Sequence, residues 1–316
     1  MTGIQIIQDG NKLPDSETRT VATIGVFDGV HSGHQALLSL VVEHAKALGL
    51  ASVVVTFDKH PTKVTSPQHA PKTLTELDQK LELFYNNGIE YVYLINFDKE
   101  RSKTLATRFF QEVFVEGIHS EVIYVGEDFQ FGYQKEGDLE LLRREGEKIG
   151  ITVNGVPLKQ DSSNGYEPIS STVIREHLEH GDIELANRKL GRLYECRGQV
   201  VSGDGRGRAI GFPTANLAVP QHIAIPAEGV YAAWFLQEDG TKERAAVNIG
   251  RRPTFEEDVS KPVIEAHLLD FEGDLYGKIG KLLFVERIRE ERKFSNLDEF
   301  QAQLHEDLEM VKGILS

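Results

Sequence analysis

The sequence predicts an α/β protein: a parallel-sheet, Rossmann-like domain followed by an antiparallel Greek-key β-barrel domain with a C-terminal helix. Three observations lead to this prediction. Short β-branched runs alternate with helix-period segments in the first part, strand-like runs follow one another closely from Gly191, and apolar residues recur at helical spacing from Asn296 to Leu315. A chain of 316 residues suits two domains, which we place at residues 1–184 and 185–316.

The first domain is expected to alternate strands and helices. Its predicted strands are Val21–Phe27, Val53–Phe57, Tyr91–Ile95, Val122–Val125 and Thr152–Val156. Its predicted helices are a run from about Leu37 to Leu48, then Leu77–Asn87, Lys103–Glu116, Gly137–Ile149, Ile169–Leu178 and Ile183–Leu190. This alternation implies a parallel sheet covered on both faces, in which ligands bind outside the carboxyl ends of the strands.

The second domain is expected to be a barrel. Turn residues separate its predicted strands, which are Tyr194–Val201, Val230–Leu236, Ala245–Ile249, Val263–Leu269 and Lys281–Arg287. Short strands at close spacing, without helices between them, are typical of an antiparallel barrel.

Composition narrows the function classes. The net charge is −14, with 17 Lys and Arg against 28 Asp and Glu up to residue 184 and 18 against 21 after it. Neither charge balance therefore predicts a basic surface that would bind nucleic acid. The one cysteine, Cys196, excludes an internal disulfide and fits the reducing cytoplasm. The N-terminus lacks a signal-peptide pattern, and no apolar run approaches the ~18–20 residues of a membrane span, which excludes an integral transporter.

A glycine-rich stretch, ATIGVFDGVHSGH from Ala22 to His34, joins the first predicted strand to the first long helix. Its glycines at 25, 29 and 33 let the backbone approach a ligand, and the free N–H groups of a helix start suit an anion. His31 and His34 lie three residues apart, on one side of this turn. Two imidazoles and a helix N-terminus facing one spot would stabilise a phosphate whose charge grows during reaction.

Other interpretations of this turn stay open. HxxH spacing suits zinc, but a zinc site needs a third protein ligand, for which His44 and His60 are the nearby candidates. One histidine could instead cap the helix. Asp28 could cap the turn, or it could order the histidines and a bound nucleotide.

Polar residues also follow other predicted strands of the first domain. Asp128 lies in GEDFQFG, where it either turns the chain or faces a ligand. Ser171, Thr172 and Arg175 lie in ISSTVIREHL, at the start of a predicted helix. Hydroxyls and a guanidinium converging there would make a second anion site, although an ordinary helix start could carry the same residues.

In the second domain the stretch GDGRGRAIGFPTAN, from Gly203 to Asn216, is rich in glycine and arginine. It is not a Walker A loop, because no Lys-Ser/Thr follows its last glycine. Its N–H groups and Arg208 could reach phosphates. Thr214 and Asn216 carry hard oxygen atoms of the kind that bind magnesium, although a proline-led turn is the alternative.

Two charged residues near the end of the chain complete the candidates. Glu265 stands among apolar neighbours in VIEAHLL. It lies either on a wet face or in a site, where a carboxylate could take a proton from an attacking hydroxyl. Arg289, within RIREER, is by default a surface charge.

Together these motifs resemble those of the prokaryotic bifunctional riboflavin kinase/FAD synthetase family. GVFDGVHSGH resembles its nucleotidyltransferase signature, and FDKHP, GEDFQFG and ISSTVIR fall where its further blocks fall. GFPTANL, GVYAAW, NIGRRPTF, IEAHLLDF, DLYGK and IREERKF resemble the kinase blocks in order. The resemblance covers nearly the whole chain. Lys59 in FDKHP stands where the family often has Pro, which bears on flavin affinity.

For the first domain the resemblance implies FMN adenylyltransferase activity, with ATP and FMN as substrates and FAD as product. His31 and His34 would hold the ATP α-phosphate. The other implied contacts are Gly25, Phe27 and Asp28 in the nucleotide pocket, Asp128 near the nucleotide, and Ser171, Thr172 and Arg175 around the outgoing pyrophosphate.

For the second domain the resemblance implies riboflavin kinase activity, with ATP, riboflavin and Mg²⁺. Glu265 would be the base for the ribityl 5′-hydroxyl. The other implied contacts are Gly207 and Arg208 over the ATP phosphates, Thr214 and Asn216 at the magnesium ion, and Arg289 at the flavin.

Two other functions compete with this one. One is an HxGH nucleotidyltransferase that acts on a different phosphate substrate, against which the kinase-like motifs argue. The other is a non-catalytic flavin or nucleotide sensor, which the intact catalytic positions disfavour.

Overall fold

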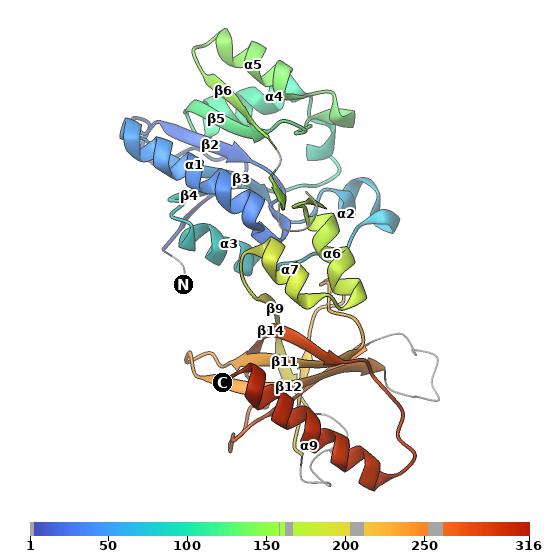
Figure 1. Ribbon diagram of the computed structural model, residues 1–316. Helices are drawn as coiled ribbons and strands as arrows, with labels where there is room; N and C mark the ends of the chain where they lie inside the picture. Colours follow the sequence, from blue (N-terminus) through green and yellow to red (C-terminus); the bar gives the residue numbers. More distant parts are fainter. Residues whose placement is uncertain (1–2, 158, 162–166, 203–211, 252–261) are drawn as a thin grey trace. The chain divides into compact units, whose positions relative to one another are not determined.

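The computed structural model describes residues 3–157, 159–161, 167–202, 212–251 and 262–316. Its contacts divide the chain into two compact units, Met1–Ser171 and Thr172–Ser316 (Figure 1). The division falls before the predicted boundary because two helices, α6 (Ser171–His180) and α7 (Ile183–Leu190), pack with the barrel strands. In the second of these helices, for example, the Asn187 side chain donates to the Phe284 carbonyl at 2.9 Å. The boundary after residue 184 stays a prediction about where the activities divide.

The first unit contains the predicted parallel sheet. Its strands are β1 (Gln5–Gln8), β2 (Thr20–Ile24), β3 (Ala51–Phe57), β4 (Tyr91–Ile95), β5 (Ser120–Gly126) and β6 (Thr152–Val156). They lie in the order β1-β4-β3-β2-β5-β6, and every neighbouring pair is parallel. A two-stranded ribbon, β7 (Gln160–Asp161) with β8 (Glu167–Pro168), follows the sheet. The sheet confirms the predicted fold class of this unit.

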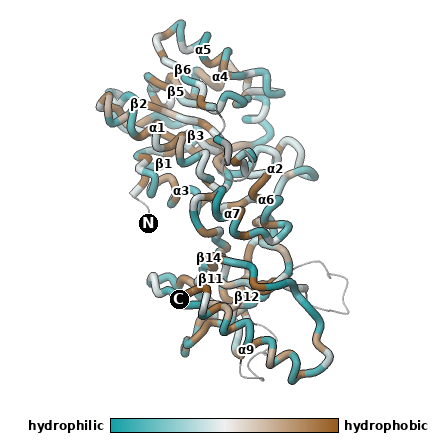
Figure 2. The backbone as a smooth tube through the Cα atoms, in the orientation of Figure 1, coloured by the Kyte–Doolittle hydropathy of each residue, from teal (hydrophilic) through white to brown (hydrophobic). Residues whose placement is uncertain are grey.

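Helices cover both faces of the sheet, so neighbouring strand residues contribute to two different cores. Val53 and Val55 pack with the helices α4 (Ala106–Phe110) and α5 (Leu139–Glu147), whereas Val54 packs with α1 (Ser32–Leu48) and α3 (Leu77–Asn86). Alternation across a doubly covered sheet explains why a central strand such as β3 is buried at nearly every position. Figure 2 shows hydrophobic stretches along these strands and mixed positions along the helices.

Several predicted boundaries differ from the structure by a few residues, and two of the differences are explained by the local backbone conformation. Strand β2 ends at Ile24 instead of Phe27, because the chain turns there and Phe27 takes a left-handed conformation with φ of 53°. The helix predicted over Lys103–Glu116 is α4 followed by a π-helical segment, Gln111–Gly117. Hydrophobic spacing does not distinguish α from π winding over so short a stretch.

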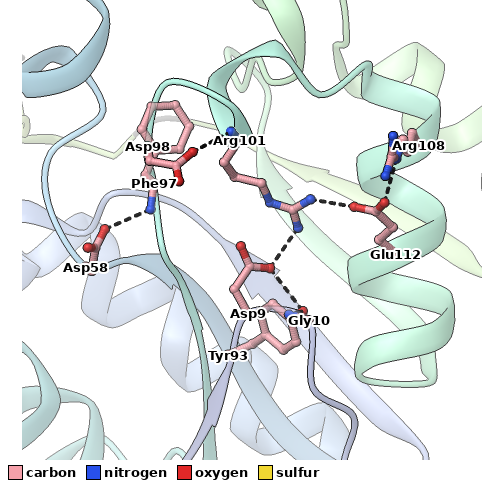
Figure 3. Close-up of polar contacts among 9 residues, drawn as sticks. All are labelled: Asp9, Gly10, Asp58, Tyr93, Phe97, Asp98, Arg101, Arg108 and Glu112. Atoms are coloured by element: carbon pink, nitrogen blue, oxygen red, sulfur yellow. Dashed lines mark hydrogen bonds and ion pairs between the residues drawn. The ribbon is translucent and has the colours of Figure 1, made fainter.

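An ion-pair network joins the end of β1 to the segment that follows β4 (Figure 3). Arg101 donates to Asp9 at 2.8 Å and to Glu112 at 2.5 Å, and Arg108 donates to the other Glu112 oxygen at 2.6 Å. The Tyr93 hydroxyl donates to Asp9 at 3.2 Å. Burial raises the pKa of Asp9 against the opposing effect of Arg101, and it raises the pKa of Tyr93 to about 12. The network fixes the start of the π segment to the sheet.

The second unit begins with α6 (Ser171–His180, whose first residue closes the first unit) and α7 (Ile183–Leu190). Its strands are β9 (Tyr194–Val201), β10 (Ala215–Ala218), β11 (Gly229–Leu236), β12 (Lys242–Arg251), β13 (Pro262–Leu268) and β14 (Ile279–Arg289). They form a closed barrel in the order β10-β13-β12-β11-β14-β9, and all pairs are antiparallel. The barrel confirms the predicted class, with β10 as a strand that the sequence did not predict.

The predicted C-terminal helix is α9 (Leu297–Ile314). Asn296 caps its start by accepting from the Glu299 N–H at 2.9 Å. Its apolar stripe, including Val311 and Leu315, packs on Ala232 of the barrel. Inside the barrel Cys196 is fully buried, and burial raises its pKa to about 12, so it remains a thiol. None of the helices within the described ranges combines the length and apolar character needed to cross a membrane.

Candidate functional site

The two histidines lie together at the start of α1. His31 is the N-cap residue, and its Nδ1 accepts a hydrogen bond from the His34 N–H at 3.3 Å. The two rings stack with centroids 3.6 Å apart and an angle of 16° between their planes. Phe27 meets the His34 ring edge-on at 5.0 Å. The structure thus places both imidazoles on one side of the turn, as the spacing predicts, and His31 also has the capping role that was the alternative.

The capping bond fixes the proton distribution on His31. An Nδ1 atom that accepts a hydrogen bond carries no proton, so a neutral His31 ring carries its proton on Nε2. The Nε2–H group is then a hydrogen-bond donor at the helix N-terminus, where the backbone dipoles also favour an anion. This arrangement can stabilise a phosphoryl oxygen without a charge on the ring.

Hydrogen bonds to other segments of the chain hold the turn that carries the two histidines. The Asp28 carboxylate is buried and accepts from the N–H groups of Leu74 and Thr75 at 2.8 and 3.3 Å. The Thr75 hydroxyl accepts from the Gly29 N–H at 3.1 Å, and the Ser171 hydroxyl donates to the Asp28 carbonyl at 2.9 Å. These contacts tie Asp28 to the segment before the helix Leu77–Asn86 and to Ser171, and its role toward a bound nucleotide stays a prediction.

Lys80 is a residue of this region that the sequence analysis did not identify. Its side chain is buried, and its ammonium donates to the Val26 carbonyl, the Thr56 hydroxyl and the Phe57 carbonyl at 3.0–3.1 Å. Burial lowers its pKa to about 8. The signal in the sequence was a lysine inside the apolar stripe formed by Leu77, Leu81 and Phe84, which is an unusual place for a charge.

The candidate zinc ligands are engaged elsewhere. His44 Nδ1 forms a hydrogen bond with the Tyr124 hydroxyl at 2.7 Å, and His60 Nδ1 accepts from the Thr62 N–H at 3.2 Å. In the part of the chain that the structure describes, no three His, Cys, Asp or Glu side chains form a group that could hold a metal.

The remaining candidates of the first domain lie on several segments. Gly25 directly follows β2, and a Cβ there would lie 3.2 Å from the Phe27 ring, which favours glycine. Asp128 is exposed and follows β5, at the same carboxyl edge of the sheet as the histidine turn. Thr172, exposed, and Arg175, half-buried, belong to the second unit, so their role at an anion site stays a prediction.

The second candidate site is a row of polar side chains across three barrel strands. Glu265 on β13 lies directly between Asn216 on β10 and Asn248 on β12. Directly paired residues point to the same face, and Glu265 alternates with the buried Ile264 and Ala266, so this row faces outward from the barrel. Asn216 is nevertheless buried, at 5 % exposure, and Glu265 is half-buried. The row is therefore partly shielded from solvent. This favours a place in a site for Glu265 over a place on a solvent-exposed face.

Neighbouring groups shelter this row. The His267 Nδ1–H donates to the Pro213 carbonyl at 2.8 Å, which holds the segment that carries the half-buried Thr214. The Phe212 ring meets the His267 ring at 5.6 Å and the His305 ring of α9 at 5.3 Å. Asn216 lies in strand β10 and not in a turn, contrary to the alternative considered for it.

Glu291 lies beside the row and was also not identified from the sequence. Its pKa is raised by burial and by Glu228, and lowered in part by a hydrogen bond with the Asn248 side chain. A Cβ at Gly250 would overlap its carboxylate. No local pattern connects Glu291 to Asn248, because the two residues meet only through the fold.

Arg289 is half-buried and not the free surface charge expected by default. Its Nε and Nη2 atoms donate to the Asp307 carboxylate on α9, at 2.9 and 2.7 Å. Asp307 also accepts from Gln303 at 2.8 Å. Arg289 is thus held in a fixed orientation by α9, and its contact with flavin stays a prediction. Gly207 and Arg208 lie outside the described residues.

Comparison with known proteins identifies the family. The FAD synthetase family model matches residues 13–173, and the riboflavin kinase family model matches residues 190–315. The chain is 36% identical over 287 residues to the bifunctional riboflavin kinase/FMN adenylyltransferase of Escherichia coli K12, covering 91% of this chain and 90% of that protein. It is 34% identical to the protein of that name from Bacillus subtilis, covering 97% and 96%.

A solved structure resembles the whole chain. The crystal structure described as a macrolide-efflux protein from Streptococcus pneumoniae matches with a TM-score of 0.87 and 30% identity, over 98% of this chain and 99% of that one. Both family models match in the order that the motifs predict, and the curated relatives align over nearly their full length. The chain therefore belongs to the bifunctional riboflavin kinase/FMN adenylyltransferase family.

Proposed function

We propose that the two family reactions are divided between the two predicted domains. Residues 185–316 transfer the γ-phosphate of ATP to the 5′-hydroxyl of riboflavin, which gives FMN and ADP. Residues 1–184 let an FMN phosphate oxygen attack the α-phosphorus of a second ATP. A new P–O bond forms, the bond to the bridging oxygen of the β-phosphate breaks, and FAD and pyrophosphate are released.

The stacked pair His31 and His34 is the observation that carries the adenylyl-transfer assignment. The His31 Nε2–H would donate to a non-bridging oxygen of the α-phosphate, and the N-terminus of α1 would add backbone dipoles. Donors aimed at an oxygen that gains charge stabilise the transition state more than the ground state. The attacking phosphate is already an anion, so the site needs no general base. Gly25, Phe27 and Asp28 would shape the nucleotide pocket, and Asp128 would lie near the nucleotide.

The row centred on Glu265 supports the kinase assignment. Its carboxylate would take the proton of the riboflavin 5′-hydroxyl as that oxygen attacks the γ-phosphorus, and Asn216 and Asn248 flank Glu265 on the two neighbouring strands. Arg289, oriented by Asp307, would contact the flavin.

The donor set around Asn216 fits magnesium. The Thr214 hydroxyl and the Asn216 amide oxygen, with the Glu265 carboxylate next to them, are the hard oxygen ligands that Mg²⁺ prefers. Thr214 and Asn216 would hold the ion, which when bound would neutralise charge on the ATP phosphates.

A product time course tests both assignments. Purified protein incubated with riboflavin, ATP and Mg²⁺ should form FMN first and FAD later. Supplied with FMN and ATP instead, it should form FAD and pyrophosphate without ADP. Accumulation of FMN with no FAD would contradict the adenylyl-transfer assignment, and retention of flavin with no turnover would favour a sensor.

A further inference from the structure

A buried ammonium lies between the carboxyl ends of β2 and β3. Lys80 is 8 % exposed, and its Nζ donates at 3.1 Å to the Val26 carbonyl, at 3.1 Å to the Thr56 hydroxyl and at 3.0 Å to the Phe57 carbonyl. An ammonium has three N–H donors, and here each has an acceptor. The Thr56 hydroxyl itself donates to the Val26 carbonyl at 3.3 Å, so these groups form a closed set.

The ammonium continues the pairing of the two strands beyond the point where their backbones separate. The β2–β3 ladder ends at Ile24 and Val55, followed by one bond from the Gly25 N–H to the Val55 carbonyl. The Val26 carbonyl, two residues beyond the end of β2, accepts from Lys80 and from the Thr56 hydroxyl of β3. Lys80 therefore links the two chain segments, together with Thr56, at the edge where the histidine turn begins.

The segment beside Lys80 holds the same turn at further points. Val26 directly precedes Phe27, whose φ of 53° is unfavourable for a residue with a side chain. Such conformations persist only where the surrounding structure imposes them. Leu74 and Thr75, just before α3, bind Asp28 and Gly29. The segment from Leu74 to Lys80 thus forms hydrogen bonds with the turn on both sides of Phe27.

We propose that Lys80 is a positioning residue for adenylyl transfer, whose charged ammonium fixes the Phe27–Asp28 turn and, through it, the two imidazoles. The inference rests on the function proposed for the histidine turn. Lys80 does not itself reach the reacting phosphates. It acts by holding the backbone from which His31 and His34 project.

The charge state of Lys80 makes the inference measurable. Burial lowers its pKa to about 8, and the two carboxylates that face it, Asp28 and Asp58, partly oppose this. A neutral amine has only two donors and turns a lone pair toward one of the three acceptors. The rate of adenylyl transfer should therefore fall as the pH rises through about 8, because the turn is then held at one point fewer.

Folding stability should change in the opposite direction. The unfolded chain holds the lysine proton up to its ordinary pKa of 10.5, whereas the folded chain releases it near 8. Between these values the unfolded state binds more protons, so stability rises with pH. A purely structural lysine would give only this rise, and a positioning lysine gives a fall in rate as well.

The experiment compares three variants in the full-length protein. Lys80→Met removes the ammonium and keeps the length of the side chain, Thr56→Val removes one acceptor and keeps the shape, and the exposed Lys46→Met is the matched control. FAD formation from FMN and ATP is followed from about pH 6.5 to about pH 9.5, a range that spans the pKa of Lys80. Riboflavin phosphorylation and thermal unfolding are measured on the same samples.

The expected results are specific to each variant. Lys80→Met should lower kcat for FAD formation by about 10- to 100-fold, the scale of a small misplacement, with little change in KM for ATP and without the alkaline decline. Thr56→Val should move the decline to lower pH, because the ammonium has lost a partner. Lys46→Met should match the wild type, and riboflavin phosphorylation should persist in all three.

Two outcomes would overturn the inference. One is a folded Lys80→Met variant with the wild-type kcat and pH profile. The other is an unshifted decline in Thr56→Val, which decides the matter even if Lys80→Met fails to fold. A His31→Ala variant run alongside separates the two proposals: if it retains FAD formation, the function proposed for the histidine turn fails, whatever Lys80 does.

Discussion

The two candidate sites are built in different ways. The histidine turn is one continuous segment, whose geometry is set by a capping bond within it and by contacts to Asp28 and Val26 from outside. The row centred on Glu265 draws its members from three strands, and the pairing register alone brings them together. Substitution of residues that bind the backbone of the histidine turn should therefore impair the first site. The second site should be impaired by substitutions within the row and by changes that shift the strand register.

The largest effect that separates the two sites is expected from Glu265→Gln. Loss of a general base lowers a rate by roughly 10²–10⁴, so FMN formation from riboflavin should fall by such a factor. FAD formation from supplied FMN should be unchanged. The measurement is a pair of initial rates, one with riboflavin and one with FMN.

Glu272→Gln is the matched control for this experiment, because Glu272 is exposed and outside the row. Unaltered riboflavin phosphorylation in Glu265→Gln would remove Glu265 as the base. A loss of both activities would argue that the sites are not separate.

His31→Ala should give the reverse pattern. Removing a donor from an oxyanion site costs about 10²–10³ in kcat, so FAD formation should drop by that amount or below detection while FMN formation continues. FMN should then accumulate in reactions that begin with riboflavin, which chromatography of the products would detect.

The exposed His69 provides the control, and His69→Ala should keep both activities. Equal losses of FMN and FAD formation in His31→Ala would count against two sites that work independently.

These two sites also differ in how far the sequence predicts them. The histidine turn is local, so glycine spacing, a helix start and two histidines three residues apart suffice. The row around Glu265 depends on which strands pair and in what register, and a period-two pattern does not contain that information. Asn248 therefore gives no signal in the sequence, although the structure places it beside Glu265.

The fold shows the same division between local and long-range information. Alternation predicts the parallel sheet and the barrel, but β10 has only four residues and directly follows Pro213-Thr214, so the sequence favours a turn there. Arg289 is a surface charge by composition alone, and only the packing of α9 supplies Asp307 as its partner. Lys80 does give a signal, a charge within an apolar helix stripe, but the signal does not identify its acceptors.

A smaller effect, on stability, should follow from the network in Figure 3. The Arg101 side chain is only 14% exposed, and it holds both Asp9 and Glu112. Arg101→Met leaves Asp9 with the Tyr93 hydroxyl and Glu112 with Arg108 as their remaining partners, and the loss of a partner by a buried polar group costs about 1–3 kcal/mol. The free energy of unfolding of the first unit should therefore decrease by an amount in that range. Urea denaturation would measure the decrease.

The exposed Arg143 offers a matched comparison, because its pair with Glu140 lies in solvent. Exposed pairs contribute about 0–1 kcal/mol, so Arg143→Met should change stability little. Equal losses in the two variants would mean that the Arg101 network contributes no more than a surface ion pair.

The smallest expected effect comes from helix caps, which the two units share as a feature. Asn296 caps α9 on the barrel and Asp138 caps α5 on the sheet, each by one bond of 2.9 Å to a backbone N–H. Replacing either residue with Ala should cost about 1 kcal/mol. Amide hydrogen exchange should report each loss in the unit that carries the substitution. Because α9 also orients Arg289 through Asp307, Asn296→Ala should raise KM for riboflavin slightly, whereas Asp138→Ala should leave it unchanged. An unchanged KM in Asn296→Ala, together with the expected loss of stability, would mean that the position of Arg289 does not depend on the first turn of α9.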